Sequence, residues 1–443
     1  MAQNTGKDFR RAFFRLVSGS DIALLLVLAF VATLPLASRL PVGETLVVPG
    51  QIAVGPAVVT LSDMYLGILT IVLVAYTQQV QLPRSSLILF LVIFLDMMVI
   101  STMINGVDAE AVVEVFQWGE MIVLAVLLGL LLREEWQRRR VLWGLVYIGV
   151  ARAIWTVIYF SLFGYPGRRF DVFIEGAALI LLVGLLLSEK SRVRHFLAFV
   201  PLATAVLIGQ ERKIWVGIAL ASAAVFSLYI IKHRHDSVAL RRFILSGVLG
   251  SLLFIAAVLV LAPQEIIGRI YTLLALVPGI GGQTQFERTF LFETGIQIVK
   301  HNPVFGVGPE NWFQAKETYA TDQLTGFEQS TNSNLGPHST LLKILAETGV
   351  LGFGLFVLIF VRPLRYLGWY LNSTHGTCLH LVLFGLFSYV SLVAAVRAGG
   401  FVLRVYLFIT LGFFLSYEMS NRNCRPNSDL DTERRVEPTD SSE

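Results

Sequence analysis

Charged residues are scarce in this chain of 443 residues. Only 15% of the residues are Asp, Glu, Lys or Arg, whereas 55% are hydrophobic and the mean hydropathy is +0.68. Soluble globular domains carry about 25% charged and about 45–50% apolar residues. The shortage of charge therefore excludes an ordinary soluble domain and indicates a protein embedded in a membrane.

Cysteine is nearly absent as well. The chain has two cysteines, Cys378 and Cys424. Both fall on the side of the membrane that the loop charges, described below, predict to be cytoplasmic. A reducing compartment keeps thiols reduced, and two cysteines cannot form a disulfide framework around an external segment. Any structure outside the membrane must therefore be held by packing and hydrogen bonds.

The motifs of cofactor chemistry are also missing. The polar segment 263–337 contains no DxD or HExxH pattern and no cluster of His and Cys, and its carboxylates are scattered. The whole chain lacks a Walker A loop, a nucleophile elbow and a dinucleotide fingerprint. We therefore predict no cofactor, no catalytic metal and no use of ATP or nucleotide sugars. The net charge is +4, and the basic residues lie at the ends of predicted helices, which argues against nucleic-acid binding.

Long apolar runs are what the chain has in abundance. A membrane-spanning helix needs about 20 mostly apolar residues, and these runs are too long for the short alternating strands of a membrane barrel. The predicted fold class is an all-α polytopic membrane protein with about 12 transmembrane helices. The predicted spans are 21–38, 62–80, 85–104, 111–132, 140–162, 171–188, 194–210, 213–231, 243–262, 339–361, 378–396 and 400–418.

The loop charges predict the orientation. Lysine and arginine accumulate in cytoplasmic loops, and the basic clusters near residues 7–15, 133–140, 190–194, 232–242 and 422–435 fall in alternate connections. An even number of spans then places both termini in the cytoplasm. The predicted organisation is a cytoplasmic N-terminus at 1–20, transmembrane helices 1–9 at 21–262, a periplasmic loop at 263–337, transmembrane helices 10–12 at 338–418, and a disordered cytoplasmic tail at 419–443.

The periplasmic loop has an ordered pattern. Residues 286–300 (FERTFLFETGIQIVK) place apolar side chains at helical spacing, which predicts an amphipathic helix along the membrane surface. Asn302-Pro303 ends this helix. A second helix is predicted at about 309–320, since proline suits the first helical position. Residues 321–336 are rich in Thr, Ser, Asn and Gly and predict a mobile loop.

A glycine turn and a histidine stand at the edges of these elements. Gly306 and Gly308 predict a tight turn between the two loop helices. His338 opens the next membrane helix, whose positive end disfavours the imidazolium form. A neutral histidine can accept a proton, so His338 is a candidate general base. The alternative is a histidine that only caps the helix or lies in the interface.

Arginines on the outer side form a second set of candidates. Arg212 and Lys213 lie in a very short outward hairpin, and Arg168 and Arg169 follow a Tyr-Pro-Gly turn. The planar guanidinium matches phosphate oxygens in pairs. Together with Arg288 these side chains could bind an anion such as a lipid pyrophosphate. For Lys213 the simpler alternative is a long side chain that reaches for water at the lipid headgroups.

Several charges fall inside predicted spans, where a central charge costs roughly 2.5–3.5 kcal/mol on insertion scales. They are Arg152, Lys343, Glu347 and Arg404. Lys343 and Glu347 are four residues apart and are predicted to pair on one helix face. Asp96, in the third span, is predicted to be buried and hydrogen-bonded.

Two stretches resemble a known family. RTFLFETGIQIVKHNPVFGVGPENWF and, after a spacer, HSTLLKILAETGVLGF are similar to the O-antigen ligase and polymerase superfamily, in which a helix that begins with Arg, a P-x-F-G-V-G turn and an H-N-x-x-L-x-x-L-x-E-T-G motif follow one another. The resemblance covers about 288–354, with weaker support from Arg212 and from GRRFD at 167–171. Two positions depart from it: Ser339 replaces the usual Asn, and Glu211 replaces the usual Ser.

The resemblance implies a membrane glycosyltransferase of lipopolysaccharide biosynthesis in the bacterial inner membrane. Its donor would be a glycan on undecaprenyl pyrophosphate, and its acceptor a hydroxyl of lipid A-core at the periplasmic face. His338 would deprotonate the acceptor, while Arg212 and Arg288 would bind the leaving pyrophosphate. The reaction would be a metal-independent displacement with inversion. Further possible substrate-binding residues are Arg168, Arg169, Lys213 and Lys343.

Three other functions remain open at this point. An O-antigen or exopolysaccharide polymerase would use the same donor and extend a growing glycan. A transporter of lipid-linked sugars should show internal repeats and charges near the membrane midplane, and no convincing repeat is present. A docking platform for an assembly complex would leave His338 replaceable.

Overall fold

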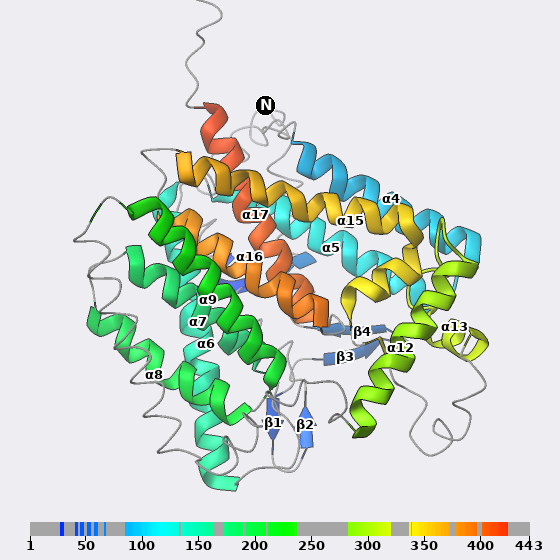
Figure 1. The fold of residues 1–443 in the computed structure, drawn as a ribbon, viewed down its shortest axis with the longest axis horizontal. Helices are drawn as coiled ribbons and strands as arrows, with labels where there is room; N and C mark the ends of the chain where they lie inside the picture. The colour runs from blue at the N-terminus through cyan, green and yellow to red at the C-terminus, as the bar shows by residue number, and fades with distance from the viewer. Residues whose placement is uncertain are drawn as a thin grey trace, which may run out of the picture.

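The computed structural model is a bundle of long helices with two small β-hairpins (Figure 1). The structure describes residues 27–30, 40–42, 45–47, 51–54, 57–60, 66–67, 85–132, 134–163, 172–188, 192–209, 211–234, 236, 282–319, 336–337, 339–372, 378–396 and 401–423. The predicted spans at 21–38, 62–80 and 243–262 fall largely or wholly outside these residues, as does the predicted mobile loop at 321–336.

The remaining predicted spans coincide with helices. These are α4 (Ser86–Asn105), α5 (Ala109–Leu131), α6 (Glu135–Phe163), α7 (Phe173–Ser188), α8 (Arg192–Gly209), α9 (Arg212–His233), α15 (Thr340–Asn372), α16 (Cys378–Val396) and α17 (Phe401–Asn423). In the described part of the chain, six helices are long and apolar enough to cross a membrane, on α4, α5, α6, α9, α15 and α17, and three shorter apolar helices accompany them. A helical multi-pass membrane protein is thus confirmed, and α17 runs past the predicted end of the last span.

Two short hairpins depart from the all-α prediction. Strand β1 (Leu40–Val42) pairs antiparallel with β2 (Thr45–Val47), and β3 (Gln51–Val54) pairs antiparallel with β4 (Ala57–Thr60). They occupy a connection rich in Val, which favours extended backbone. The apolar stretches of this connection are too short to predict a membrane span. Their alternation of side chains is compatible with strands, but no strand was predicted from it.

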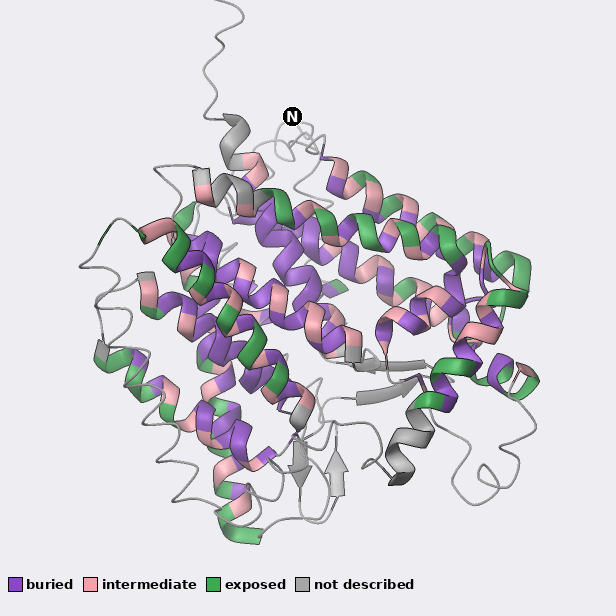
Figure 2. Ribbon diagram, in the orientation of Figure 1, coloured by how far each residue is buried: buried purple, intermediate pink, exposed green. Residues whose placement is uncertain are grey.

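The helices form two groups. Helix α4 packs on α15, and α5 packs on α17, whereas α6, α7 and α8 pack on one another and α9 packs on α7 and α16. Helix α16 also contacts α15 and α17, and so joins the groups. Buried residues concentrate on the central helices, and α4 and α8 each present an exposed face (Figure 2). Those faces carry apolar side chains such as Leu89 and Leu197, as expected of surfaces that meet lipid.

The predicted burial of Asp96 is wrong. Its side chain is exposed, although α4 is otherwise apolar. The buried stripe of α4 runs through Leu91, Phe94 and Met98 toward Ser101. Asp96 follows Phe94 by two positions, which is more than half a helical turn away from that stripe. The position of Asp96 on the helix therefore turns its carboxylate away from the buried stripe of α4.

Candidate functional site

Helix α15 is broken near its start. Gly349 has φ 66° and ψ −170°, a conformation inside the helix that is essentially restricted to glycine. A break of this kind frees backbone groups that the helix would otherwise pair. The turn after α12 supplies the partners: the N–H of Val350 donates to the Pro303 carbonyl at 2.8 Å, and the N–H of Leu351 donates to the Val304 carbonyl at 3.5 Å.

The same turn also donates to the first part of α15. The N–H of Val307 donates to the Ala346 carbonyl at 3.0 Å, and the N–H of Gly308 donates to the Glu347 carbonyl at 2.9 Å. Gly306 and Gly308 have positive φ values of 69° and 94°, so the predicted glycine turn is confirmed. The turn and the broken helix thus satisfy each other's backbone, and we call this arrangement the turn–helix interlock (residues 303–308 with 346–351).

The C-terminal end of α4 holds the interlock from a third side. The Ser101 hydroxyl lies 2.6 Å from the Phe305 carbonyl and 2.9 Å from the Glu347 carbonyl. The Asn105 amide donates to the Gly306 carbonyl at 3.2 Å. Since Ser101 is completely buried, its hydrogen bonding replaces solvent for these carbonyls.

Replacing Ser101 with alanine is expected to lower the free energy of unfolding by about 1–3 kcal/mol, because the Phe305 and Glu347 carbonyls each lose a hydrogen-bond donor. Equilibrium unfolding in detergent measures the change. The matched control is Ser161→Ala, since the Ser161 hydroxyl is exposed and bonds only within its own helix, to Val157. Equal stability of the two variants would contradict the role assigned to Ser101.

The external segment packs on α15 through a separate apolar core. Helices α12 (Gly282–His301) and α13 (Trp312–Tyr319) contribute to it together with the turn and the first part of α15. Gly295 of α12 lies directly against Leu342 of α15, because a Cβ on this glycine would approach the Leu342 side chain to 2.8 Å. The core consists of Phe290, Leu291, Ile298, Val307, Trp312, Ala315, Leu342 and Ala346.

The helical conformation predicted in this segment is confirmed, with one shift, and the position of the first helix along the membrane surface stays a prediction. The helix predicted at 286–300 is observed as α12, and α12 ends before Asn302-Pro303. The helix predicted at about 309–320 begins only at Trp312, because residues 309–311 form a turn. Glu310, in that turn, has a positive φ of 61°. A left-handed conformation costs a residue with a side chain about 1–2 kcal/mol, so its surroundings must favour it.

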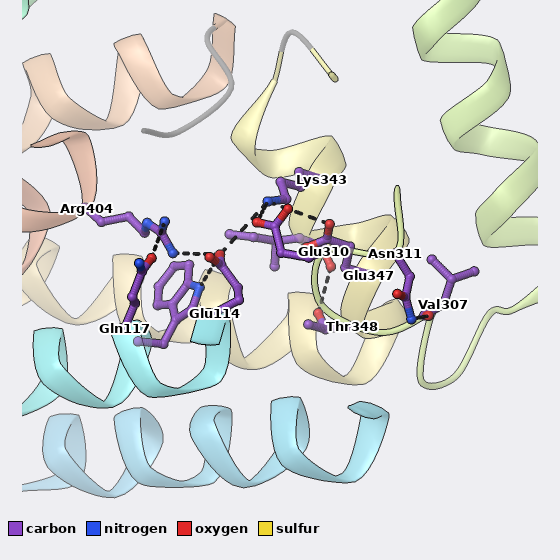
Figure 3. Close-up of polar contacts among 11 residues, drawn as sticks. Glu114, Gln117, Val307, Glu310, Asn311, Lys343, Glu347, Thr348 and Arg404 are labelled. Atoms are coloured by element: carbon purple, nitrogen blue, oxygen red, sulfur yellow. Dashed lines mark hydrogen bonds and ion pairs between the residues drawn. The ribbon is translucent and has the colours of Figure 1, made fainter. Parts of the chain in front are cut away.

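The Glu310 side chain belongs to an ionic cluster. We define this cluster as Glu114, Glu310, Lys343, Glu347 and Arg404 (Figure 3). The Lys343 ammonium lies 2.5 Å from Glu310 Oε1, 3.7 Å from Glu347 Oε1 and 3.9 Å from Glu114 Oε1. The predicted pairing of Lys343 with Glu347 is thereby confirmed. Glu310 completes it from the turn, 33 positions earlier in the sequence.

Arg404 extends the cluster to α17. Its guanidinium donates to Glu114 at 2.6 Å and to the Gln117 side-chain carbonyl at 3.1 Å. Trp118 donates its indole N–H to Glu114 at 3.0 Å and lies 5.5 Å below the Arg404 guanidinium. The cluster thus connects α5, α15, α17 and the turn at one end of the bundle.

Aromatic rings and a small cavity border the cluster. Trp118 contacts Phe94, Phe356 and Phe408 at ring-centroid distances of 5.2, 6.2 and 5.8 Å. A cavity of about 20 Å³ lies between α4, α5, α15 and α17, and Glu114, Lys343, Glu347 and Arg404 line it. Its size suits about one water molecule and is far too small for a sugar.

Arg152, another charge predicted inside a span, is also paired. Its guanidinium donates to Glu175 at 2.9 Å, and both side chains are buried. Thr156 lies within 3.5 Å of the same carboxylate oxygen. This pair joins α6 to α7 inside the bundle. Removing either partner of a buried ion pair is strongly destabilising, because the other charge is left buried and unpaired.

The structure describes the predicted site residues unevenly. Arg212 and Arg288 lie in α9 and α12, and only their backbone is described. Lys213 forms an ion pair with Glu211 at 3.1 Å, and Lys343 belongs to the ionic cluster. His338, Arg168 and Arg169 lie outside the described residues, although Pro337 and Ser339 on either side of His338 are included.

The packing brings two of these positions into one unit. Helix α12 carries Arg288 and packs on α15, which begins two residues after His338. Arg212 begins α9, which packs on α7 and α16. The described contacts therefore connect the Arg288 helix directly to the segment of His338. The relation of Arg212 to them stays a prediction.

Sequence reasoning missed two members of the cluster. Glu310 was counted among scattered loop carboxylates, and Glu114 was not singled out in the span 111–132. Glu114 could have been predicted, because an ionisable residue in an apolar span usually pairs with another charge. Arg404, in another predicted span, had no partner assigned from the sequence. No comparable signal existed for Glu310, since its partner depends on how the turn docks.

Comparison with known proteins places part of the chain in a family. A family model described as O-antigen ligase matches residues 177–357. The matched region begins in α7, includes α8, α9, α12 and α13, and ends in α15 beyond the interlock. No curated protein matches the chain.

Proposed function

We propose, on the premise of the O-antigen ligase superfamily membership that the match over residues 177–357 supports, that the chain is a glycosyltransferase that moves a glycan from undecaprenyl pyrophosphate to an acceptor hydroxyl of lipid A-core. The observation that carries the proposal is the extent of the family match. Residues 177–357 include Arg212, Arg288 and His338, the residues whose chemistry the transfer needs. A helical bundle of the observed kind suits substrates that are themselves anchored in a bilayer.

The proposed reaction is a direct displacement at the anomeric carbon. His338, as a neutral imidazole, accepts the proton of the acceptor hydroxyl. The acceptor oxygen forms a bond to the anomeric carbon while the bond from this carbon to the phosphate oxygen breaks, which inverts the configuration. The electron pair leaves with the lipid pyrophosphate. A histidine whose pKa lies near the operating pH is an efficient base for such a step.

Arg212 and Arg288 are the proposed pyrophosphate ligands. Negative charge accumulates on the leaving phosphate as the glycosidic bond breaks, and fixed guanidinium groups stabilise that charge more in the transition state than in the ground state. Arg168, Arg169 and Lys213 are proposed as further substrate contacts, whereas Lys343 is engaged by the carboxylates of the ionic cluster. The loop 263–337 is proposed to face the periplasm, with both termini in the cytoplasm of a bacterial cell.

Reconstitution tests the proposed activity. The full chain is placed in lipid nanodiscs with an undecaprenyl-pyrophosphate-linked glycan and lipid A-core. Glycan on lipid A-core identifies a ligase, and a longer glycan that remains on the carrier identifies a polymerase. If neither product forms, and vesicles containing the protein instead carry the lipid-linked glycan across the bilayer, the transferase proposal is wrong.

Glycan transfer is expected to persist in EDTA at the rate measured without it. The physical reason is that arginines neutralise the leaving pyrophosphate in the proposed reaction, so no divalent cation is needed to do so. The measurement compares initial rates of product formation with EDTA and with added Mg²⁺. A strict requirement for Mg²⁺ would contradict the metal-independent mechanism.

A further inference from the structure

The positive charge of Lys343 is balanced by carboxylates of the protein, and is therefore poorly suited to bind a substrate phosphate. Three carboxylates, from Glu114, Glu310 and Glu347, lie within 3.9 Å of its ammonium. The Lys343 side chain is only 18% exposed. An ammonium has three N–H donors, and carboxylates from three segments of the chain compete for them here. This arrangement suits a cation that holds protein segments together.

The Glu310 side chain is the only member of the cluster that comes from the turn between α12 and α13. The other four side chains lie on α5, α15 and α17. Glu310 adopts a left-handed backbone conformation and directs its carboxylate onto Lys343. A residue kept in a rarely populated conformation persists only where its surroundings fix it, and such residues concentrate at functional sites.

The opposite side of the cluster is buried and hydrogen-bonded. Glu114 accepts hydrogen bonds from Arg404 and Trp118 at 2.6 and 3.0 Å, and Glu114 and Glu347 are both buried. The ion pair of Glu310 with Lys343 therefore ties the turn to a fixed point among three membrane helices. Backbone hydrogen bonds join the turn to α15 at residues 346–351, farther along the helix and away from His338. The ion pair acts closer to the start of α15.

We propose that Glu310 and Lys343 are positioning residues for the glycosyl transfer. Their ion pair holds the turn and α13 against the first turns of α15, and thereby sets the place of α12, the helix that carries Arg288, relative to the start of α15. The inference rests on the proposed function for the identity of the reaction. It assigns Lys343 an indirect role in place of direct contact with the donor phosphate.

A distance measurement tests the mechanical part without any enzymatic assay. Spin labels are attached at Glu317→Cys on α13 and Val357→Cys on α15, both exposed positions, in a chain with Cys378→Ser and Cys424→Ser. The wild-type pair is expected to give a narrow distance distribution. Glu310→Gln, which keeps the size of the side chain and removes its charge, is expected to broaden it. An unchanged distribution would overturn the proposal.

Kinetics with the full chain test the functional part. Glu310→Gln and Lys343→Met are each expected to lower kcat by about 10- to 100-fold, as for a small misplacement of reacting groups, with the KM for lipid-linked donor unchanged. Increased KM with unchanged kcat in Lys343→Met would instead indicate direct donor binding and overturn the proposal. Full activity in both variants would overturn it as well. An inactive wild type would refute the proposed function, and the spin-label result would still decide whether the ion pair holds the turn.

The control is an ion pair of similar type at a remote place. Arg139 and Glu135 pair at 3.3 Å on the surface of α6, with side chains that are 40% and 43% exposed. Glu135→Gln is expected to leave the distance distribution, kcat and KM unchanged, because exposed pairs contribute little. Thermal unfolding of every variant confirms that changes in kcat come from folded protein.

Discussion

Replacing Gly349 with alanine is expected to prevent stable folding of the external segment and to abolish activity. A residue with a side chain is strongly disfavoured at φ 66° and ψ −170°. A Cβ at this position would also approach the Val304 carbonyl oxygen to 2.3 Å and the Gly306 nitrogen to 2.7 Å. These are backbone atoms, which cannot rotate away as a flexible side chain can.

The expected cost of Gly349→Ala is several kcal/mol. Backbone strain contributes about 1–3 kcal/mol, and separation of the turn from α15 would leave buried backbone groups without partners, at about 1–3 kcal/mol each. Size-exclusion chromatography in detergent and thermal unfolding measure the loss of folded protein. Limited proteolysis of the segment between α12 and α15 should become faster.

Gly354 provides the matched control on the same helix. A Cβ there would meet nothing within 4 Å, and its φ is not among the positive values. Gly354→Ala is therefore expected to be neutral or to stabilise the helix by up to about 1 kcal/mol. If Gly349→Ala behaved like Gly354→Ala, the turn–helix interlock could not be a determinant of the fold.

The elements that sequence patterns predicted well are those set by local chemistry. An apolar run of sufficient length can satisfy its backbone in lipid only as a helix, so α4, α5 and α16 were predicted close to their observed bounds. The pairing of Lys343 with Glu347 follows from helical spacing alone. The turn at Gly306 and Gly308 follows from the conformational freedom of glycine.

The features that the sequence did not predict depend on contacts between distant segments. The break at Gly349 lies within a pattern that otherwise predicts one continuous helix, and it forms because residues 303–304 supply carbonyls to the freed N–H groups. Glu310 finds its partner only when the turn docks on α15. Asp96 was placed on the wrong side of α4, because a lone charge in an apolar run does not specify the register of the helix.

The candidate site shows the same division. Glycine turn, loop helix and helix start could be predicted as separate pieces, since each has a local signal. The docking of the turn on α15, with Ser101 of α4 bonded to the turn and to α15, could not be predicted. In the proposed reaction the docked arrangement matters, because the turn packs on α15, the helix that begins two residues after His338.

Replacing His338 with alanine is expected to lower kcat by about 100- to 10,000-fold, the usual contribution of a positioned general base. The KM for the donor should change little, because the pyrophosphate is assigned to Arg212 and Arg288. His338→Gln tests the base role further, since an amide can hydrogen-bond to the acceptor hydroxyl but cannot take its proton. Both variants should unfold at the wild-type temperature, and added imidazole should restore part of the rate in His338→Ala.

His301 is the matched control for this substitution. It lies at the end of α12, is exposed, bonds through Nδ1 to the Gln297 carbonyl at 2.8 Å, and stacks on Tyr319. His301→Ala removes an imidazole from the same external segment and is expected to leave kcat within experimental error. Glycan transfer at the wild-type rate by folded His338→Ala would exclude general-base catalysis by this residue. Transfer would then depend on the arginines and on alignment of the two lipid-bound substrates, since positioning alone can supply a large part of a rate enhancement.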